Sequence, residues 1–150
     1  MEPLQESRHL LEQLLAQTSR HVDIVSPSLE PHLFAVPAVI DALTTLARRG
    51  RNTRIRVIIE QLDPQQFEGH RLLALAKRLT TAMSVKVLNS HPEWNRENVV
   101  ICDRSAGLLL VPQDKRSRLF SSRAEAQRWA ETFERLWLAA EESPELRQLR

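Results

Sequence analysis

The chain has 150 residues, of which 42% are apolar and 27% charged, a composition that excludes a disordered chain and is typical of a globular domain with a core. Its formal net charge of +2 does not favour a dedicated nucleic-acid-binding protein. No apolar run approaches the ~18 residues of a transmembrane helix, and residues 1–17 lack the pattern of a signal peptide. We therefore expect a cytoplasmic protein without a membrane span, and the single cysteine, Cys102, fits a reducing compartment.

Helical and extended patterns alternate through the first part of the chain. Apolar residues at helical spacing are followed by shorter runs rich in valine and isoleucine, and Pro27 and Gly50 mark breaks between them. The expected helices cover residues 4–18, 36–49 and 70–79, and the expected strands cover residues 22–26, 54–60 and 84–88.

The later part of the chain is expected to form an antiparallel hairpin and a long helix. Two strands, over residues 98–102 and 107–111, are joined by the turn sequence DRSAG. Ser122, with Glu125 three residues later, forms a capping box for a helix that continues to Ala140. The tail at 141–150 is expected to fray.

The expected order of elements is therefore α-β-α-β-α-β-β-β-α. Strands that are separated by helices form parallel crossovers, whereas the late hairpin adds antiparallel strands. The sequence predicts one domain over residues 1–150, with an N-terminal helix within residues 1–20. Its fold class is α/β, with a mixed sheet flanked by helices on both faces.

Several segments resemble one half of a phospholipase-D-like domain. The family's first strand and the loop after it resemble VDIVSPSLEPH, and its helix and second strand resemble VIDALTTLARRGRNTRIRVIIE. Its signature segment and the strand before it are similar to RENVVICDRSAGLLL and VKVLN, and its closing helix is similar to WAETFERLW. The resemblance covers nearly all of residues 20–138 and points to a single-half, uncharacterised bacterial branch, sometimes attached to an acetyltransferase domain.

The active motif of that family is His-x-Lys, followed after four residues by Asp. Its histidine attacks phosphorus and its lysine binds the phosphate, because residues i and i+2 of a strand face the same side. With Asp103 at the motif's Asp, Arg96 stands at the His position and Asn98 at the Lys position. A guanidinium stays protonated and cannot attack phosphorus, and Asn98 carries no charge. The resemblance therefore implies the fold without the phosphodiester chemistry, and we assign no catalytic residue.

Polar residues near the expected strand ends form a candidate binding pocket. Ser26 and Ser28 follow the first strand and Glu60 ends the second, at the carboxyl edge where α/β sheets bind ligands. Structural roles, in helix caps and closed loops, are the alternative for the same side chains. The residues expected to line the pocket are Ser26, Ser28, Glu60, His91, Trp94, Arg96, Asn98 and Asp103.

Some of these residues have a second interpretation. Asp103 opens a tight turn, where an aspartate carboxylate bonds nearby backbone N–H groups. Trp94 is either a contact residue for a partner or a side chain that folds back onto the core. His91 could be a shifted nucleophile, but Glu93 rather than lysine stands two residues after it. Cys102, within the apolar run VVIC, is expected to be a buried, inert thiol.

No metal or cofactor site is expected. His70 and His91 are isolated, and the sequence has no Cys-x-x-Cys pair, no Gly-x-Ser-x-Gly elbow and no phosphate-binding glycine loop. Five arginines from Arg48 to Arg56 could contact nucleic-acid phosphates. A solvated helix end followed by a strand edge explains them equally well, and the run lacks the aromatic residues that stack on single strands.

Three hypotheses on function follow. The favoured one is a catalytically inactive phospholipase-D-like domain that acts as a binding or oligomerisation module, as an accessory domain to another protein. Its partners would be a second copy in a homodimer, another protein or an anionic small ligand. The alternatives are an enzyme with a re-purposed pocket, either a phosphodiesterase or another hydrolase, and a nucleic-acid-binding domain that uses Arg48 to Arg56.

Overall fold

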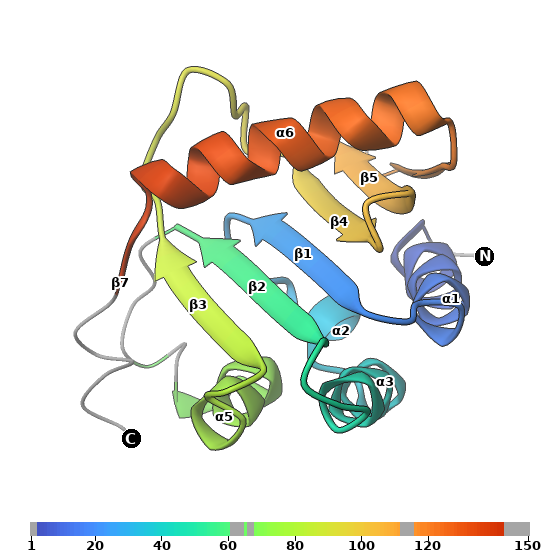
Figure 1. The fold of residues 1–150 in the computed structure, drawn as a ribbon, viewed down its shortest axis with the longest axis vertical. Coiled ribbons are helices and arrows are strands. Elements are labelled where there is room, and N and C mark those ends of the chain that lie inside the picture. The colour runs from blue at the N-terminus through green and yellow to red at the C-terminus, as the bar shows by residue number, and fades with distance from the viewer. Residues whose placement is uncertain (1–2, 61–64, 66–67, 112–115, 143–150) are drawn as a thin grey trace.

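The computed structural model describes residues 3–60, 65, 68–111 and 116–142, and a seven-stranded sheet is its central layer (Figure 1). The strand order is β6-β5-β4-β1-β2-β3-β7. The strands are β1 (His21–Ser26), β2 (Arg54–Ile59), β3 (Met83–Val87), β4 (Asn98–Cys102), β5 (Ala106–Val111), β6 (Arg116–Phe120) and β7 (Glu141–Glu142). The described helices are α1 (Pro3–Ala16), α2 (Pro31–Phe34), α3 (Pro37–Ala47), α5 (Arg71–Arg78) and α6 (Arg123–Ala139). None of the helices in these ranges is long and apolar enough to cross a membrane.

The middle of the sheet is parallel and its two sides are antiparallel. Strands β1, β2 and β3 run in the same direction and are connected through α3 and α5. Strand β4 runs antiparallel to β1 and continues into the antiparallel strands β5 and β6, while the short β7 pairs with β3. Strands β1 and β2 are buried along almost their whole length, and besides apolar residues they bury the charged Asp23 and Arg56. The predicted α/β fold with a mixed sheet is confirmed.

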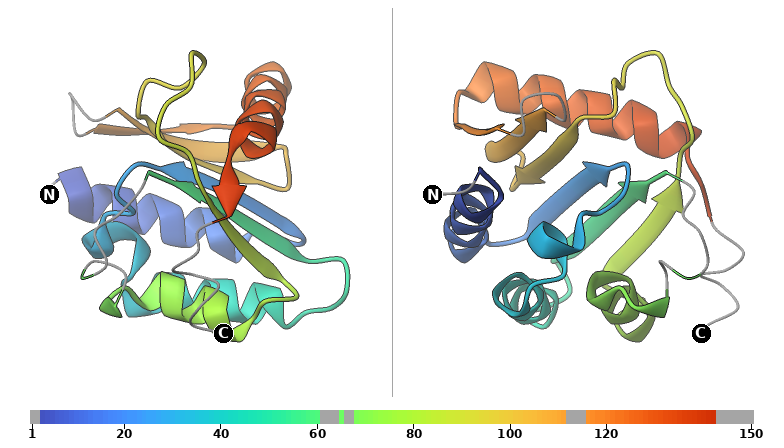
Figure 2. Two further views of the ribbon diagram at one scale, coloured as in Figure 1. Left: turned by 90° about the vertical axis from the view of Figure 1, so that its left-hand side faces the viewer. Right: turned by 180° about the vertical axis from the view of Figure 1, so that it is seen from behind.

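Helices cover both faces of the sheet (Figure 2). Helices α1, α2, α3 and α5 pack on one face around a core that includes Phe34, Leu43 and Ile55. Helix α6 crosses the other face and buries Phe133 and Leu136 in a second core. The predicted arrangement of helices on both faces is therefore also confirmed.

Three short elements differ from the sequence expectation. Strand β6 has the sequence RSRLF, in which arginine and serine interrupt the apolar pattern. Helix α2 is a single turn of four residues that begins at a proline. Strand β7 lies in the segment that was expected to fray, and it is held by two residue pairs with β3. The rest of that tail, 143–150, lies outside the described residues. Elements this short carry no periodicity that a sequence pattern could reveal.

Candidate functional site

The carboxyl ends of β1 and β2 and the segment between β3 and β4 lie at one end of the sheet. Ser26 ends β1 and is fully buried, and its hydroxyl donates a hydrogen bond to the side-chain oxygen of Asn98, the first residue of β4. The Ser26 oxygen also accepts a 3.1 Å hydrogen bond from the backbone N–H of Leu29, and Ser28 is exposed between them. The structure therefore brings Ser26 and Asn98 together as a bonded pair that closes the strand end.

Glu60 and Arg96 also meet at this end. Glu60 follows β2, Arg96 lies between β3 and β4, and the two side chains form an ion pair in which they are 25% and 62% exposed. Arg96 has a backbone φ of 64°, in the left-handed region that few residues other than glycine adopt. An exposed ion pair contributes little to stability. Its chemical consequence is larger, because the guanidinium of Arg96 is already paired with a carboxylate.

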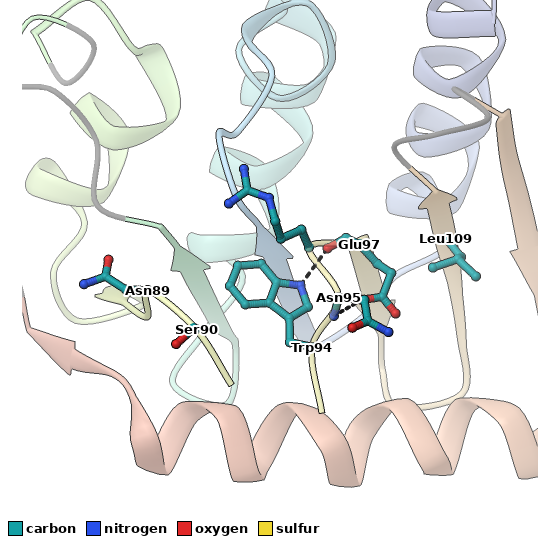
Figure 3. A pocket seen from close by; sticks show the side chains of 7 residues that line it. Asn89, Ser90, Trp94, Asn95, Glu97 and Leu109 are labelled. Carbon is teal, nitrogen blue, oxygen red and sulfur yellow. Dashed lines mark hydrogen bonds between the residues drawn. The ribbon is translucent and has the colours of Figure 1, made fainter. Parts of the chain in front are cut away.

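Trp94 folds back onto the core. Its side chain is 5% exposed and belongs to the apolar cluster beneath α6. The indole N–H donates a 2.9 Å hydrogen bond to the backbone carbonyl of Glu97, and Figure 3 shows this bond at the centre of the segment. The interpretation that Trp94 folds back onto the core is confirmed, and its role as a contact residue stays a prediction.

An open cleft of about 650 Å³ lies at the segment that holds Trp94 (Figure 3). Its polar groups are side-chain amides, a hydroxyl, a carboxylate and the Arg96 guanidinium, which suit a polar or anionic ligand. Of the predicted pocket residues, Trp94 and Arg96 line it. The lining residues are Asn89, Ser90, Trp94, Asn95, Arg96, Glu97 and Leu109.

His91 is held in the same segment but does not line the cleft. Its Nδ1 accepts a 3.1 Å hydrogen bond from the backbone N–H of Glu93, which leaves that nitrogen engaged. The Glu93 carboxylate in turn accepts hydrogen bonds of 2.8 and 2.9 Å from Arg135 of α6, and these bonds hold the pKa of Glu93 below its ordinary value. In the ranges that the structure describes, no three His, Cys, Asp or Glu side chains come together to hold a metal ion.

Asp103 lies at the opposite end of the sheet, so the expectation that it lines the same pocket is wrong. Strand β4 runs antiparallel to β1, with Val99 opposite Val25 near one end and Cys102 opposite Val22 near the other. An extended strand therefore separates Asp103, just after its last residue, from Asn98, its first. The neighbouring Cys102 is buried, and burial raises the pKa of its thiol to about 12, as expected for an inert cysteine.

The Asp103 carboxylate holds the chain between α1 and β1. It accepts hydrogen bonds from the backbone N–H groups of Ser19 (2.8 Å), Arg20 (2.8 Å) and His21 (2.9 Å). Partial burial raises its pKa, but these donors prevail and hold it below its ordinary value. Asp103 therefore bonds backbone N–H groups, as predicted. These groups belong to a loop that is distant in sequence, and not to the turn that Asp103 opens.

Asp103→Asn is expected to lower the free energy of unfolding at pH 7 by about 1–2 kcal/mol, because an amide oxygen is a weaker acceptor and cannot serve three donors as well. The folded-state pKa of Asp103 lies below 3.8, so its contribution is present above about pH 4 and is lost as the pH falls through the lower folded value. Urea unfolding at pH 7 and pH 3 measures both effects. Asp41→Asn, at an exposed position of α3, is the matched control and should change stability by less than about 0.5 kcal/mol. An Asp103→Asn effect no larger than that of Asp41→Asn would contradict the assignment.

Arg56 is not part of an exposed basic run, which corrects the expectation for Arg48 to Arg56. It is 6% exposed, and its Nε donates a 2.9 Å hydrogen bond to Asp23 of β1 while Nη1 donates a 3.2 Å bond to Glu134 of α6. Sequence reasoning missed this cluster. The signal that could have found it is an acid and a base, Asp23 and Arg56, each between two apolar residues of its strand, which the register places opposite each other.

No curated protein matches the sequence, whereas solved structures do. TrmBL2, an archaeal chromatin protein whose structure shows a mode of DNA binding, aligns with a TM-score of 0.70 and 13% identity over 95% of this chain and 52% of its own. NucT from Helicobacter pylori aligns with a TM-score of 0.63 and 11% identity over 93% of this chain and 92% of its own. The chain thus spans about half the length of TrmBL2. At these identities the likeness shows the fold alone, and that fold is phospholipase-D-like.

One family matches almost the whole sequence. The match runs over residues 4–149 and so includes every strand of the sheet. The description of this family is Domain of unknown function (DUF7931). The chain therefore belongs to the DUF7931 family, and it has a phospholipase-D-like fold.

Proposed function

We propose that the chain is a catalytically inactive phospholipase-D-like domain that acts as a binding or oligomerisation module, as an accessory domain to another protein. The observation that carries this proposal is the state of the two positions that the family's chemistry needs. Arg96 is paired with Glu60, and Asn98 is bonded to Ser26. A guanidinium has no lone pair with which to attack phosphorus, and an amide brings no charge to a phosphate. Binding therefore fits these residues better than bond cleavage.

The partner classes follow from the same end of the sheet. The cleft offers amides, a hydroxyl and a guanidinium to a polar or anionic small ligand or to a protein segment. The resemblance supports a homodimer through this end, because the family combines two motif segments from two halves or two subunits and this chain carries one. Sedimentation of the pure protein would show the dimer. A cytoplasmic location is part of the proposal, since the described cysteine is a buried free thiol.

Turnover of bis(p-nitrophenyl) phosphate tests the inactivity directly. The pure protein is expected to release no more nitrophenol than a His91→Ala variant prepared in the same way, because His91 is the one residue of this segment that could act as a displaced nucleophile. Turnover that the unmodified protein shows, and that His91→Ala, Glu60→Ala or Arg96→Ala removes while the fold is kept, would contradict the proposal. That result would favour the alternative of a re-purposed catalytic pocket.

Nucleic-acid binding is a second candidate. TrmBL2, which shares the fold over 95% of this chain, is a chromatin protein that binds DNA. Four of the five arginines from Arg48 to Arg56 are exposed, and only Arg56 is buried. A nucleic-acid-binding function is compatible with an inactive binding module. The nucleic acid would then bind where the exposed arginines lie in the fold.

A further inference from the structure

Three segments of the chain meet at the end of the sheet opposite the cleft. The backbone N–H of Arg54, at the start of β2, donates a 2.9 Å hydrogen bond to the carbonyl of Arg20, just before β1. The guanidinium of Arg49, after α3, donates a 2.9 Å bond to the carbonyl of Thr18, and the Asp103 carboxylate ties the β4–β5 turn to the same loop. Figure 1 shows the start of β1, the start of β2 and the β4–β5 turn at this end. We call this surface the arginine end, and its arginines are Arg20, Arg48, Arg49, Arg51, Arg54 and Arg104.

The positive charge of the arginine end is largely uncompensated. Two carboxylates lie at this surface: Asp103, which accepts hydrogen bonds from three backbone N–H groups, and Glu134, which pairs with Arg56 and Arg104. The six arginines of the arginine end therefore outnumber the carboxylates beside them. Although the net charge of the whole chain is only +2, positive charge is concentrated at this surface. Among the arginines of this surface, Arg20, Arg48, Arg51 and Arg54 are exposed, and their side chains form no hydrogen bond or salt bridge within the described part of the chain. The hydrogen bond from Arg56 lowers the pKa of Glu134, and the charges of Arg104 and Arg54 also act on Glu134 and help to lower it.

We propose that the arginine end binds the phosphate backbone of double-stranded nucleic acid. This inference rests on the proposed function, because it names the ligand of a binding module. Guanidinium groups present planar donor pairs that match phosphate oxygens. Several cations that are fixed close together repel one another, and a polyanion removes this repulsion while it releases its own counterions.

A duplex fits this surface better than a membrane or a single strand. The exposed large apolar residues of the described chain are Leu119 on β6 and Leu138 on α6, and neither belongs to the three segments. The surface therefore lacks the apolar residues that insert into a bilayer. It also has no tryptophan, phenylalanine or tyrosine on which unpaired bases could stack. The surface instead presents exposed arginines on segments that are hydrogen-bonded to one another, and arginines of this kind recognise the phosphate backbone rather than the base sequence.

Fluorescence anisotropy of a short labelled duplex tests the proposal with two triple variants. In Arg20→Ala/Arg51→Ala/Arg54→Ala, the dissociation constant should rise at least tenfold, and the slope of log K against log salt should fall by about 2–3 (~0.9 for each phosphate contact). The matched control is Arg71→Ala/Arg123→Ala/Arg128→Ala, which removes the same charge from exposed helix positions outside the arginine end. The control should change the dissociation constant by less than threefold. All substituted residues are exposed, and a thermal melt checks that each variant is folded.

Three results would overturn the proposal. The first is the absence of salt-dependent binding to the duplex by the unmodified protein. The second is an equal loss of affinity in both triple variants, which would trace binding to net charge rather than to this surface. The third is binding to vesicles that contain phosphatidylserine without binding to the duplex. None of these results bears on whether the protein is inactive. That part of the proposed function would be contradicted by phosphodiester turnover that depends on His91, Glu60 or Arg96.

Discussion

Arg56→Met is expected to lower the free energy of unfolding by about 3–5 kcal/mol, because it removes one partner of a buried ion pair. The Arg56 side chain is 7% exposed and that of Asp23 is 4% exposed, so water cannot replace the lost contacts. The guanidinium also lies 4.9 Å from the ring centre of Phe133 and 5.4 Å from that of Trp137, and these cation–π contacts would be lost with it. Chemical unfolding at constant pH measures the effect.

The pH dependence of this variant identifies its cause. Burial already raises the pKa of Asp23, and the hydrogen bond and charge of Arg56 oppose this rise. Without Arg56, the folded state should bind a proton at Asp23 well above the pH at which the unfolded chain releases it. Stability should then fall as the pH rises, so the loss should be larger at pH 8 than at pH 5.

Two further variants control for this prediction. Arg118 forms a similar pair with Glu125 at the surface, and Arg118→Met should cost only about 0–1 kcal/mol. The double variant Asp23→Asn/Arg56→Met no longer has the buried, unpaired carboxylate of Asp23. Its loss of unfolding free energy should therefore be smaller than that of Arg56→Met alone. A loss below about 1 kcal/mol in Arg56→Met would show that the cluster does not stabilise the fold.

Gly107→Ala is expected to destabilise the protein by about 3 kcal/mol, at the upper end of the usual cost of overpacking or beyond it. A Cβ atom at this position would collide with the backbone oxygen of Val100 and with the ring of Phe120. Phe120 is 3% exposed and packs in the core beneath α6, and the Val100 oxygen is part of a paired strand, so neither can move freely. The glycine after Asp103 is therefore required for packing between β4, β5 and β6.

The same substitution at Gly69 is the matched control, because nothing lies within 4 Å of the Cβ that it would add. Gly69→Ala should change stability by less than about 0.5 kcal/mol, or raise it by up to about 1 kcal/mol through the unfolded chain. Thermal unfolding of the two variants side by side measures the difference. Equal melting temperatures for Gly107→Ala and the unmodified protein would refute the packing role.

The sequence was sufficient to predict the main elements and the class of the fold. The long helices carry clear apolar stripes, β1 was recognisable by its alternation, and β2 by an alternation that passes into an apolar run. Ser122 caps α6 as its spacing to Glu125 predicts, with a 3.3 Å hydrogen bond from the Glu125 N–H to its hydroxyl. These features are local, and local patterns determine them.

The candidate site could be predicted only in part, because its contacts depend on register. The pair of Ser26 with Asn98 and the separation of Asp103 from both follow from the antiparallel alignment of β4 with β1. No periodicity in the sequence indicates that alignment. The burial of Arg56 has the same origin, since its partners come from β1 and α6. Composition alone therefore placed Arg56 on the surface, whereas the pairing of the strands buries it.

The two ends of the sheet differ in their chemistry. At the carboxyl ends of β1 and β2, Glu60 pairs with Arg96 and Ser26 bonds to Asn98, so these four side chains already have partners within the chain. At the other end, exposed arginines surround a loop that Asp103 holds in place. The proposed inactivity of the first end and the exposed arginines of the second together suit a protein that binds phosphates without cleaving them.

Amide chemical-shift mapping with a short duplex tests this view most directly. We expect the largest shifts at residues 18–21, 48–54 and 103–105, with residues 89–98 unchanged. Asp103→Asn should weaken the response of residues 18–21, because that loop would be held less firmly. Shifts confined to residues 89–98, around the cleft, would instead show that the protein binds nucleic acid at the opposite end of the sheet, and would contradict the assignment of the arginine end.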